Sequence, residues 1–209
     1  GIFIPPKEYI IGLNIWEHYE MQEGEYDYLY YNLKKFFSLA LKGNPNTLCL
    51  LWLRPNFYTI KTKLGEKTID NRDIFTSKQV FHSFKGYAYG QLHRMTHLDF
   101  DGYMGDKRKK LAEKFGYDCK NASHCIRLLK MGIEFLTEGK LNVWREDNQM
   151  LLGIKLGEWS LEKVQTEADR LFKLADEAFV NSKLPAEPDY KKANDLLIEI
   201  TEEFWMKNL

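Results

Sequence analysis

The sequence predicts an α+β protein in which a small, partial mixed β-sheet is followed by a predominantly helical array. Two stretches with the composition of strands lie near the start, GIFI at 1–4 and YDYLYY at 26–31. From residue 76 onward the chain shows helix caps, amphipathic spacing, and glycines or prolines that end helices. We therefore divide the chain into a sheet-containing part over 1–75 and a helical domain over 76–209.

The composition of the chain limits the partners that it can bind, polyanions and membranes in particular. With 209 residues, of which 44% are hydrophobic, the chain can bury a sizeable core. Its formal net charge is zero, so any site for a polyanion must be a local cluster of cations. No apolar run approaches the roughly 18 residues of a membrane span, so we expect no membrane partner. An odd number of cysteines, three, favours reduced thiols and a cytoplasmic location.

Two helices are expected after the aromatic strand, and each begins at an asparagine. Asn32 can cap a helix over 33–42, and Asn44, followed by proline, can cap a second helix over 45–53. The segment 56–72 is polar and irregular, which favours a hairpin or a lid-like loop.

The second part reads as a succession of helices. Thr76 and Gln79 have the spacing of a capping box, and Asp118 and Ser160 are further N-cap candidates. The predicted helices span 77–98, 106–115, 119–138, 161–180 and 189–206, with a brief strand over 141–143 and a linker over 181–188.

Glu25 and Asp27 form the first candidate site. Carboxylates at positions i and i+2 of a strand point to the same face, so both could reach one hard cation. One strand supplies too few ligands for a complete metal site, and a polar strand edge explains the pair equally well.

A stripe of cations forms the second candidate site. Lys120, His124 and Arg127 are spaced i, i+4 and i+7 on one predicted helix, with Lys130 close to the same side. Arginine and lysine on one stripe suit a phosphate chain. A solvated helix face is the alternative interpretation.

Two glycines, Gly86 and Gly90, lie inside the helix predicted from residue 77, beside Lys85 and Tyr89. A glycine in a helix interior costs about 1 kcal/mol relative to alanine. The pair therefore indicates close packing against another helix or against a ligand.

Three other patterns are weak. His93, His97 and Asp101 could bind a transition metal, although no adjacent acid completes a zinc motif. The segment 99–102 only loosely matches a calcium loop. The basic run KRKK at 107–110 is typical of a solvated face, and contact with an RNA backbone is the alternative. No P-loop, dinucleotide-binding or hydrolase-elbow motif occurs.

Four stretches together resemble a known family. They are LKKFFSLALKGNPNTLCLLW, FHSFKGYAYGQLHRM, KNASHCIRLLKMGIEFLTEGKLNV and LLGIKLGEWSLEKV. This ordered series is similar to the DNA polymerase beta-like nucleotidyltransferases of the RNA-repair-pathway type, over positions 1 to about 188.

The resemblance implies a small mixed sheet of nucleotidyltransferase type that holds two Mg²⁺ ions on three carboxylates. An NTP would donate its nucleoside monophosphate to a hydroxyl acceptor, with RNA among the candidates. Asp27 matches the third carboxylate, and Glu25 is the second choice. The helical region would close the nucleotide cleft, and its candidate nucleotide-binding residues are Lys85, Tyr89, Lys120, His124 and Arg127.

The chain departs from the family pattern in one respect. The first two carboxylates belong to a D-x-D after a G-S turn, and no such segment occurs in these 209 residues. The chain is therefore expected to be either a fragment or a degenerate relative, and whether it is an enzyme stays open. The alternative function is a non-catalytic nucleotide- or RNA-binding, or protein-interaction, module derived from that family.

Overall fold

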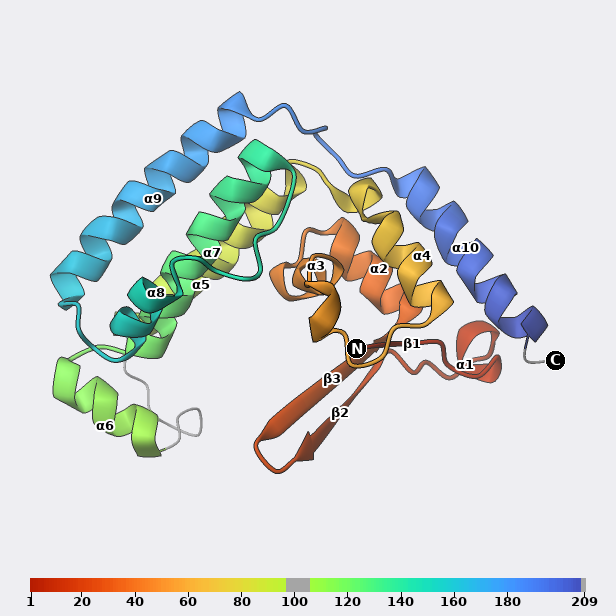
Figure 1. The fold of residues 1–209 in the computed structure, drawn as a ribbon, viewed down its shortest axis with the longest axis horizontal. Helices are drawn as coiled ribbons and strands as arrows, with labels where there is room; N and C mark the ends of the chain where they lie inside the picture. Colours follow the sequence, from red (N-terminus) through yellow and green to blue (C-terminus); the bar gives the residue numbers. More distant parts are fainter. Residues whose placement is uncertain (97–105, 208–209) are drawn as a thin grey trace. The chain divides into compact units, whose positions relative to one another are not determined.

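The computed structural model describes residues 1–96 and 106–207 of the chain. The predicted helix end near residue 98, the possible ligands His97 and Asp101, and the calcium-like segment 99–102 lie outside the described residues. Contacts group the chain into two units, one formed by 1–76 and 187–209 and the other by 77–186 (Figure 1).

The first unit contains a three-stranded mixed sheet with the order β1-β3-β2. Here β1 (Ile2–Phe3) runs parallel to β3 (Tyr26–Asn32), and β2 (His18–Glu23) pairs with β3 in an antiparallel hairpin. The hairpin extends away from the helices of this unit (Figure 1). The α+β prediction is confirmed, and β2 is the strand that sequence reasoning missed.

Helices cover one end of this sheet. They are α1 (Glu8–Ile11), α2 (Leu33–Leu41), α3 (Pro45–Leu51), α4 (Lys63–Asp70) and α10 (Tyr190–Lys207), with 3₁₀ turns η1 (Pro55–Phe57) and η2 (Arg72–Phe75). The sequence division placed the last helix in the second domain, but α10 packs on α2, α4 and η2. The rings of Phe36, Phe37 and Phe75 are buried in the core of this unit.

The two asparagine caps are confirmed. The side-chain oxygen of Asn32 accepts from the backbone N–H of Lys35 at 2.6 Å, and that of Asn44 accepts from Thr47 at 3.1 Å. The hairpin or lid expected over 56–72 is wrong, because α4 occupies that segment. Thr62 caps α4 by accepting from the N–H of Gly65 at 3.1 Å. The sequence analysis overlooked this N-cap because the segment is mostly polar.

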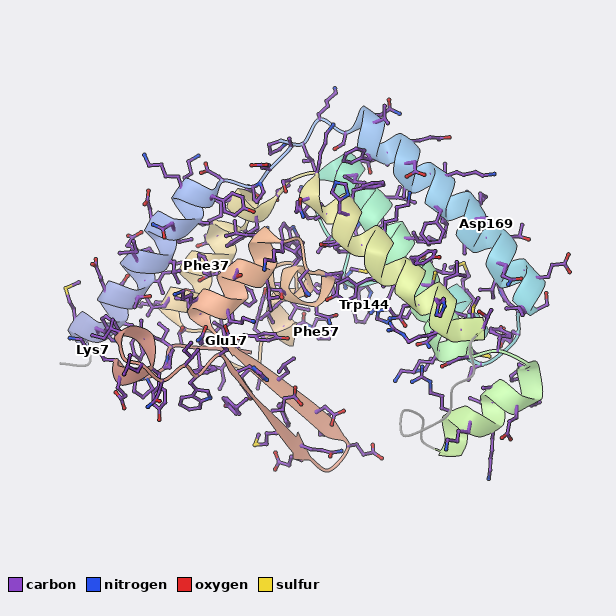
Figure 2. All side chains as sticks on the ribbon, turned by 180° about the vertical axis from the view of Figure 1, so that it is seen from behind. Lys7, Glu17, Phe37, Phe57, Trp144 and Asp169 are labelled. Carbon is purple, nitrogen blue, oxygen red and sulfur yellow. The ribbon has the colours of Figure 1, made fainter. Side chains whose placement is uncertain are left out.

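The second unit is built around one central helix. Its elements are α5 (Gln79–Thr96), α6 (Asp106–Phe115), α7 (Cys119–Glu138), α8 (Asn148–Lys155) and α9 (Leu161–Asn181). All four other helices pack on α7, and the two long helices α5 and α9 flank it (Figures 1 and 2). Eleven residues of α7 are therefore buried, including Cys125, Ile126 and Phe135.

The capping box predicted at Thr76 does not form. Helix α5 begins at Gln79, and the hydroxyl of Ser77 accepts from the Gln79 N–H at 3.3 Å. The hydroxyl of Thr76 is buried and finds no hydrogen-bond partner among the described residues. The cap is therefore one residue later than the T-x-x-Q pattern indicated.

The strand predicted over 141–143 is also wrong. An ion-pair network fixes this loop instead, since Arg145 binds Glu134 of α7 at 2.5 Å and Asp147 at 2.8 Å. Asp147 in turn pairs with Lys130 of α7. The loop leads into α8, which the sequence analysis did not predict.

Part of the basic run at 107–110 has a structural role. Arg108 donates to both carboxylate oxygens of Asp118, at 3.2 and 2.6 Å, and to the side-chain oxygen of Asn121 at 2.8 Å. Asp118 is itself buried and caps α7 by accepting from the N–H groups of residues 120 and 121. Arg108 therefore fixes α6 to the start of α7, and it does not belong to a solvated face.

We predict that Asp147→Asn lowers the stability of the second unit by about 1.5–3 kcal/mol near pH 7, because two cations lose a charged hydrogen-bond partner. Burial alone would raise the pKa of Asp147, but the bonds from Arg145 and Lys130 lower it from 3.8 to about 2. The stabilisation is thus complete above about pH 4 and is lost as the pH falls through about 2. Urea unfolding of the full chain at fixed pH values measures both effects.

The matched control is Asp195→Asn, which removes the same charge from an exposed position on α10. Equal destabilisation by both substitutions, or a loss for Asp147→Asn that is unchanged at pH 2, would contradict the role of the network.

Candidate functional site

The one face of α7 that its neighbours leave open carries basic side chains. Lys120 is exposed there, and His124 and Arg127 are half-buried. Arg94 of α5 adds a further cation close enough to influence His124, and sequence reasoning missed it because it lies on another helix. We call Arg94, Lys120, His124 and Arg127 the cationic stripe. The structure therefore brings together all three predicted residues of α7.

His124 is neutral at physiological pH. Burial, together with the positive charges of Arg127, Lys120 and Arg94, lowers its pKa from 6.5 to about 4. Its Nδ1 atom lies 3.4 Å from the Nη2 atom of Arg127, a distance that suits a donated N–H. The imidazole can therefore orient the guanidinium without adding charge of its own.

No carboxylate among the described residues pairs with the other cations of the stripe, which are Arg94, Lys120 and Arg127. Lys130, which the spacing placed near the same side, is instead paired with Asp147. Three uncompensated cations on one face create a positive potential that attracts an anion.

Lys85 and Tyr89 lie on a different face. Nine residues separate Lys85 from Arg94, which corresponds to about two and a half helical turns and so to opposite sides of α5. Lys85 pairs with Asp176 of α9 and lies 5.0 Å from the ring centre of Phe81. The five predicted nucleotide-binding residues are therefore divided between two surfaces.

The packing explanation for Gly86 and Gly90 is wrong. A side chain at Gly86 would meet nothing within 4 Å, and one at Gly90 would meet only Arg94, a residue of the same helix. The close contact between α5 and α7 instead involves Gly132, where an added Cβ would lie 3.1 Å from the Cβ of Phe84. A glycine at position 86 lowers helix stability by about 1 kcal/mol relative to alanine, and no close helix contact compensates for this loss.

A groove runs between α5 and α9 over the unexplained glycine. Its volume is about 510 Å³. We call it the α5–α9 groove, and it is lined by Phe81, His82, Lys85, Gly86, Tyr89, Leu92, Asp169 and Phe172. Figure 2 marks Asp169 on α9. Its lining is mainly aromatic and aliphatic, in contrast to the stripe.

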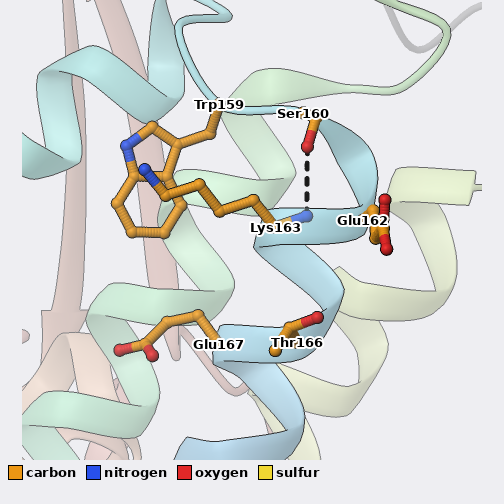
Figure 3. Close-up of a pocket in the computed structure, with 6 residues that line it drawn as sticks. All are labelled: Trp159, Ser160, Glu162, Lys163, Thr166 and Glu167. Carbon is orange, nitrogen blue, oxygen red and sulfur yellow. Dashed lines mark hydrogen bonds between the residues drawn. The ribbon is translucent and has the colours of Figure 1, made fainter.

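Another hollow lies at the first turn of α9 (Figure 3). It measures about 330 Å³ and is bordered by Trp159, Ser160, Lys163 and Glu167. The ammonium group of Lys163 lies 4.0 Å from the ring centre of Trp159, and Ser160 caps the helix by accepting from the Lys163 N–H at 3.2 Å. The polar groups of this hollow thus already serve the local structure.

The first unit has a cavity of about 640 Å³ around Trp52 and Tyr58. Arg72 donates to the backbone oxygen of Leu51 at 3.2 Å and stacks near Trp52, 5.6 Å from its ring centre. Lys61 pairs with Glu66 at 2.9 Å. Internal partners therefore already engage these basic groups.

The acidic pair lies at the tip of the β2–β3 hairpin. Asp27 is on β3, opposite Gln22, but Glu25 belongs to the turn and not to the strand, so the expected same-face spacing does not apply. Both side chains are exposed. Among the described residues, no group of three His, Cys, Asp or Glu side chains is placed to hold a metal ion. The residues present therefore do not make up the predicted magnesium site.

Of the helices in the described part of the chain, none has the length and apolar character needed to cross a membrane. The three cysteines are free thiols, and burial raises the pKa of Cys125 to about 12.

Comparison with known proteins gives one family. The RlaP family, described as the RNA repair pathway DNA polymerase beta family, matches residues 1–199. Neither the curated proteins nor the solved structures contain a significant match. The match covers nearly the whole chain, including both units and every residue of the cationic stripe. The chain therefore belongs to the RNA repair pathway DNA polymerase beta family, a family of nucleotidyltransferase type.

Proposed function

We propose that this chain binds a nucleoside triphosphate through the cationic stripe and takes part in transferring its nucleoside monophosphate to a hydroxyl acceptor. The observation that carries the binding is the group of three uncompensated cations around the neutral His124. Guanidinium groups bind phosphate oxygens in pairs, and lysine adds a compact charge. Membership in a polymerase-beta-like family favours a nucleotide over other polyanions.

The position of Asp27 supports the transfer step. β1 runs parallel to β3 with Ile2 opposite Tyr31, so residues that continued β1 in the N-terminal direction would run along β3 toward Asp27. Carboxylates on such a continuation would come close to Asp27. The proposal requires a G-S turn and a D-x-D encoded before Gly1, and a gene without them would contradict the transfer.

We predict that Arg127→Ala weakens NTP binding by about 1.5–3 kcal/mol, because a charged hydrogen bond to phosphate is lost. Isothermal titration of the full chain with ATP and GTP measures the change.

Arg170→Ala is the matched control, since it removes an arginine that lies outside the cationic stripe and pairs with Glu167 of the same helix at 2.7 Å. Its nucleotide affinity is expected to equal that of the unmodified chain. Unchanged affinity in Arg127→Ala, combined with a lower melting temperature, would instead assign Arg127 a purely structural role.

We predict that Asp27→Asn lowers nucleotidyl transfer by the complete gene product by about 100-fold or more, the scale found when one preorganised electrostatic group is removed from an active site. Glu25→Gln serves as the control, because this neighbouring carboxylate lies in the turn and not on β3. Transfer is measured as pyrophosphate released from the NTP. Equal activity of the two variants would remove Asp27 from the catalytic site.

A further inference from the structure

Gly86 exposes its backbone in the α5–α9 groove. It is exposed, and a Cβ built on it would meet no atom within 4 Å. No neighbouring helix therefore requires a glycine there, although any other residue except proline would favour the helix. A side chain at this position would project into the groove, which makes free access to the backbone the property that glycine provides.

Aromatic rings border this exposed backbone. Tyr89 is 63% exposed, although it lies inside a helix. Phe81 is held in place by stacking on Phe179 of α9, with ring centres 4.3 Å apart. Phe172 adds a third ring to the lining. The exposed ring of Tyr89 beside a bare stretch of backbone suits a planar ring, because stacking requires flat access.

The charged groups at the groove, Lys85, Asp169 and Asp176, leave one net negative charge. The ammonium group of Lys85 is paired with Asp176, and Asp169 contributes one further carboxylate. A phosphate chain would gain little here, in contrast to the cationic stripe. A neutral heterocycle with amino groups fits better, since its ring can stack and Asp169 can accept a hydrogen bond from an amino group.

The groove and the stripe are poorly placed to hold one and the same nucleotide. Lys85 lies on the opposite side of α5 from Arg94, and Tyr89 lies about 140° around the helix from it, so a nucleotide with its phosphates on Arg94 would have to wrap around α5 to stack its base on Tyr89. A base in the groove is therefore assigned to a second molecule. If the stripe holds the NTP, the second molecule of the reaction is the acceptor.

We propose that the α5–α9 groove binds an unpaired base of a single-stranded RNA acceptor. This inference rests on the proposed function, because the stripe must be occupied by the NTP. The base must be unpaired, since only a base released from its helix exposes both a face and an edge to the protein. Gly86 gives access, Tyr89 supplies the stacking face, and Asp169 binds the base edge.

Gly86→Leu tests the proposal because it fills the groove and strengthens the helix at the same time. Binding of a labelled oligoadenylate to the full chain, measured by fluorescence anisotropy, is expected to fall about tenfold, the scale of one lost base–aromatic stacking contact. Gly86→Ala is the matched control, since it raises helix propensity but adds only one methyl group. Both variants are expected to melt at or above the temperature of the unmodified chain.

The outcomes separate this inference from the proposed function. Loss of oligoadenylate binding in Gly86→Leu and in Tyr89→Ala, with ATP affinity unchanged, supports the groove as an RNA site. Unchanged oligoadenylate affinity in Gly86→Leu, or no oligoadenylate binding by the unmodified chain, overturns the inference. Reduced ATP affinity in Gly86→Leu also overturns it and assigns the groove to the NTP. The effect of Arg127→Ala on ATP affinity tests the proposed NTP site alone, so it does not depend on the outcome of the oligoadenylate measurements.

Discussion

The burial of α7 is the constraint on which the second unit depends. Four helices pack on α7, so its apolar residues point in almost every direction and only one narrow stripe remains for charge. Along this stripe the second half is neutralised, because Lys130 and Glu134 are bound by Asp147 and Arg145. The first half retains Lys120 and Arg127, which pair with no carboxylate in the part of the chain that the structure describes. The same packing that makes the core therefore concentrates uncompensated charge at one place.

Local signals allowed much of this fold to be predicted. The caps at Asn32, Asn44, Asp118 and Ser160 were correct because each depends on a bond between residues two or three positions apart. The incorrect predictions concern segments whose structure depends on residues distant in the sequence. The strand β2 becomes visible only through its pairing with β3, and the loop after α7 follows an ion-pair network instead of its strand-like composition.

In the candidate site too, features set by nearby residues were predicted and features set by distant residues were not. Spacing on one helix correctly placed Lys120, His124 and Arg127 together, but no spacing rule could reveal Arg94 on a neighbouring helix. Lys85 and Tyr89 were grouped with the stripe on the assumption that two glycines mark a helix contact. Once that contact is assigned to Gly132, the glycine at 86 and the rings around it become a surface of their own. The surface around Arg94 is cationic, whereas the surface around Lys85 and Tyr89 is mainly aromatic and aliphatic.

The most direct test of the cationic stripe is the titration of His124 by NMR, with and without nucleotide. In the free chain, burial and the three neighbouring cations are expected to hold the pKa of its imidazole near 4. A bound triphosphate would neutralise those cations and raise the pKa, so nucleotide binding should tighten as the pH falls. A pKa near 6.5 in the free chain, or a pKa that does not change when ATP is added, would contradict the account.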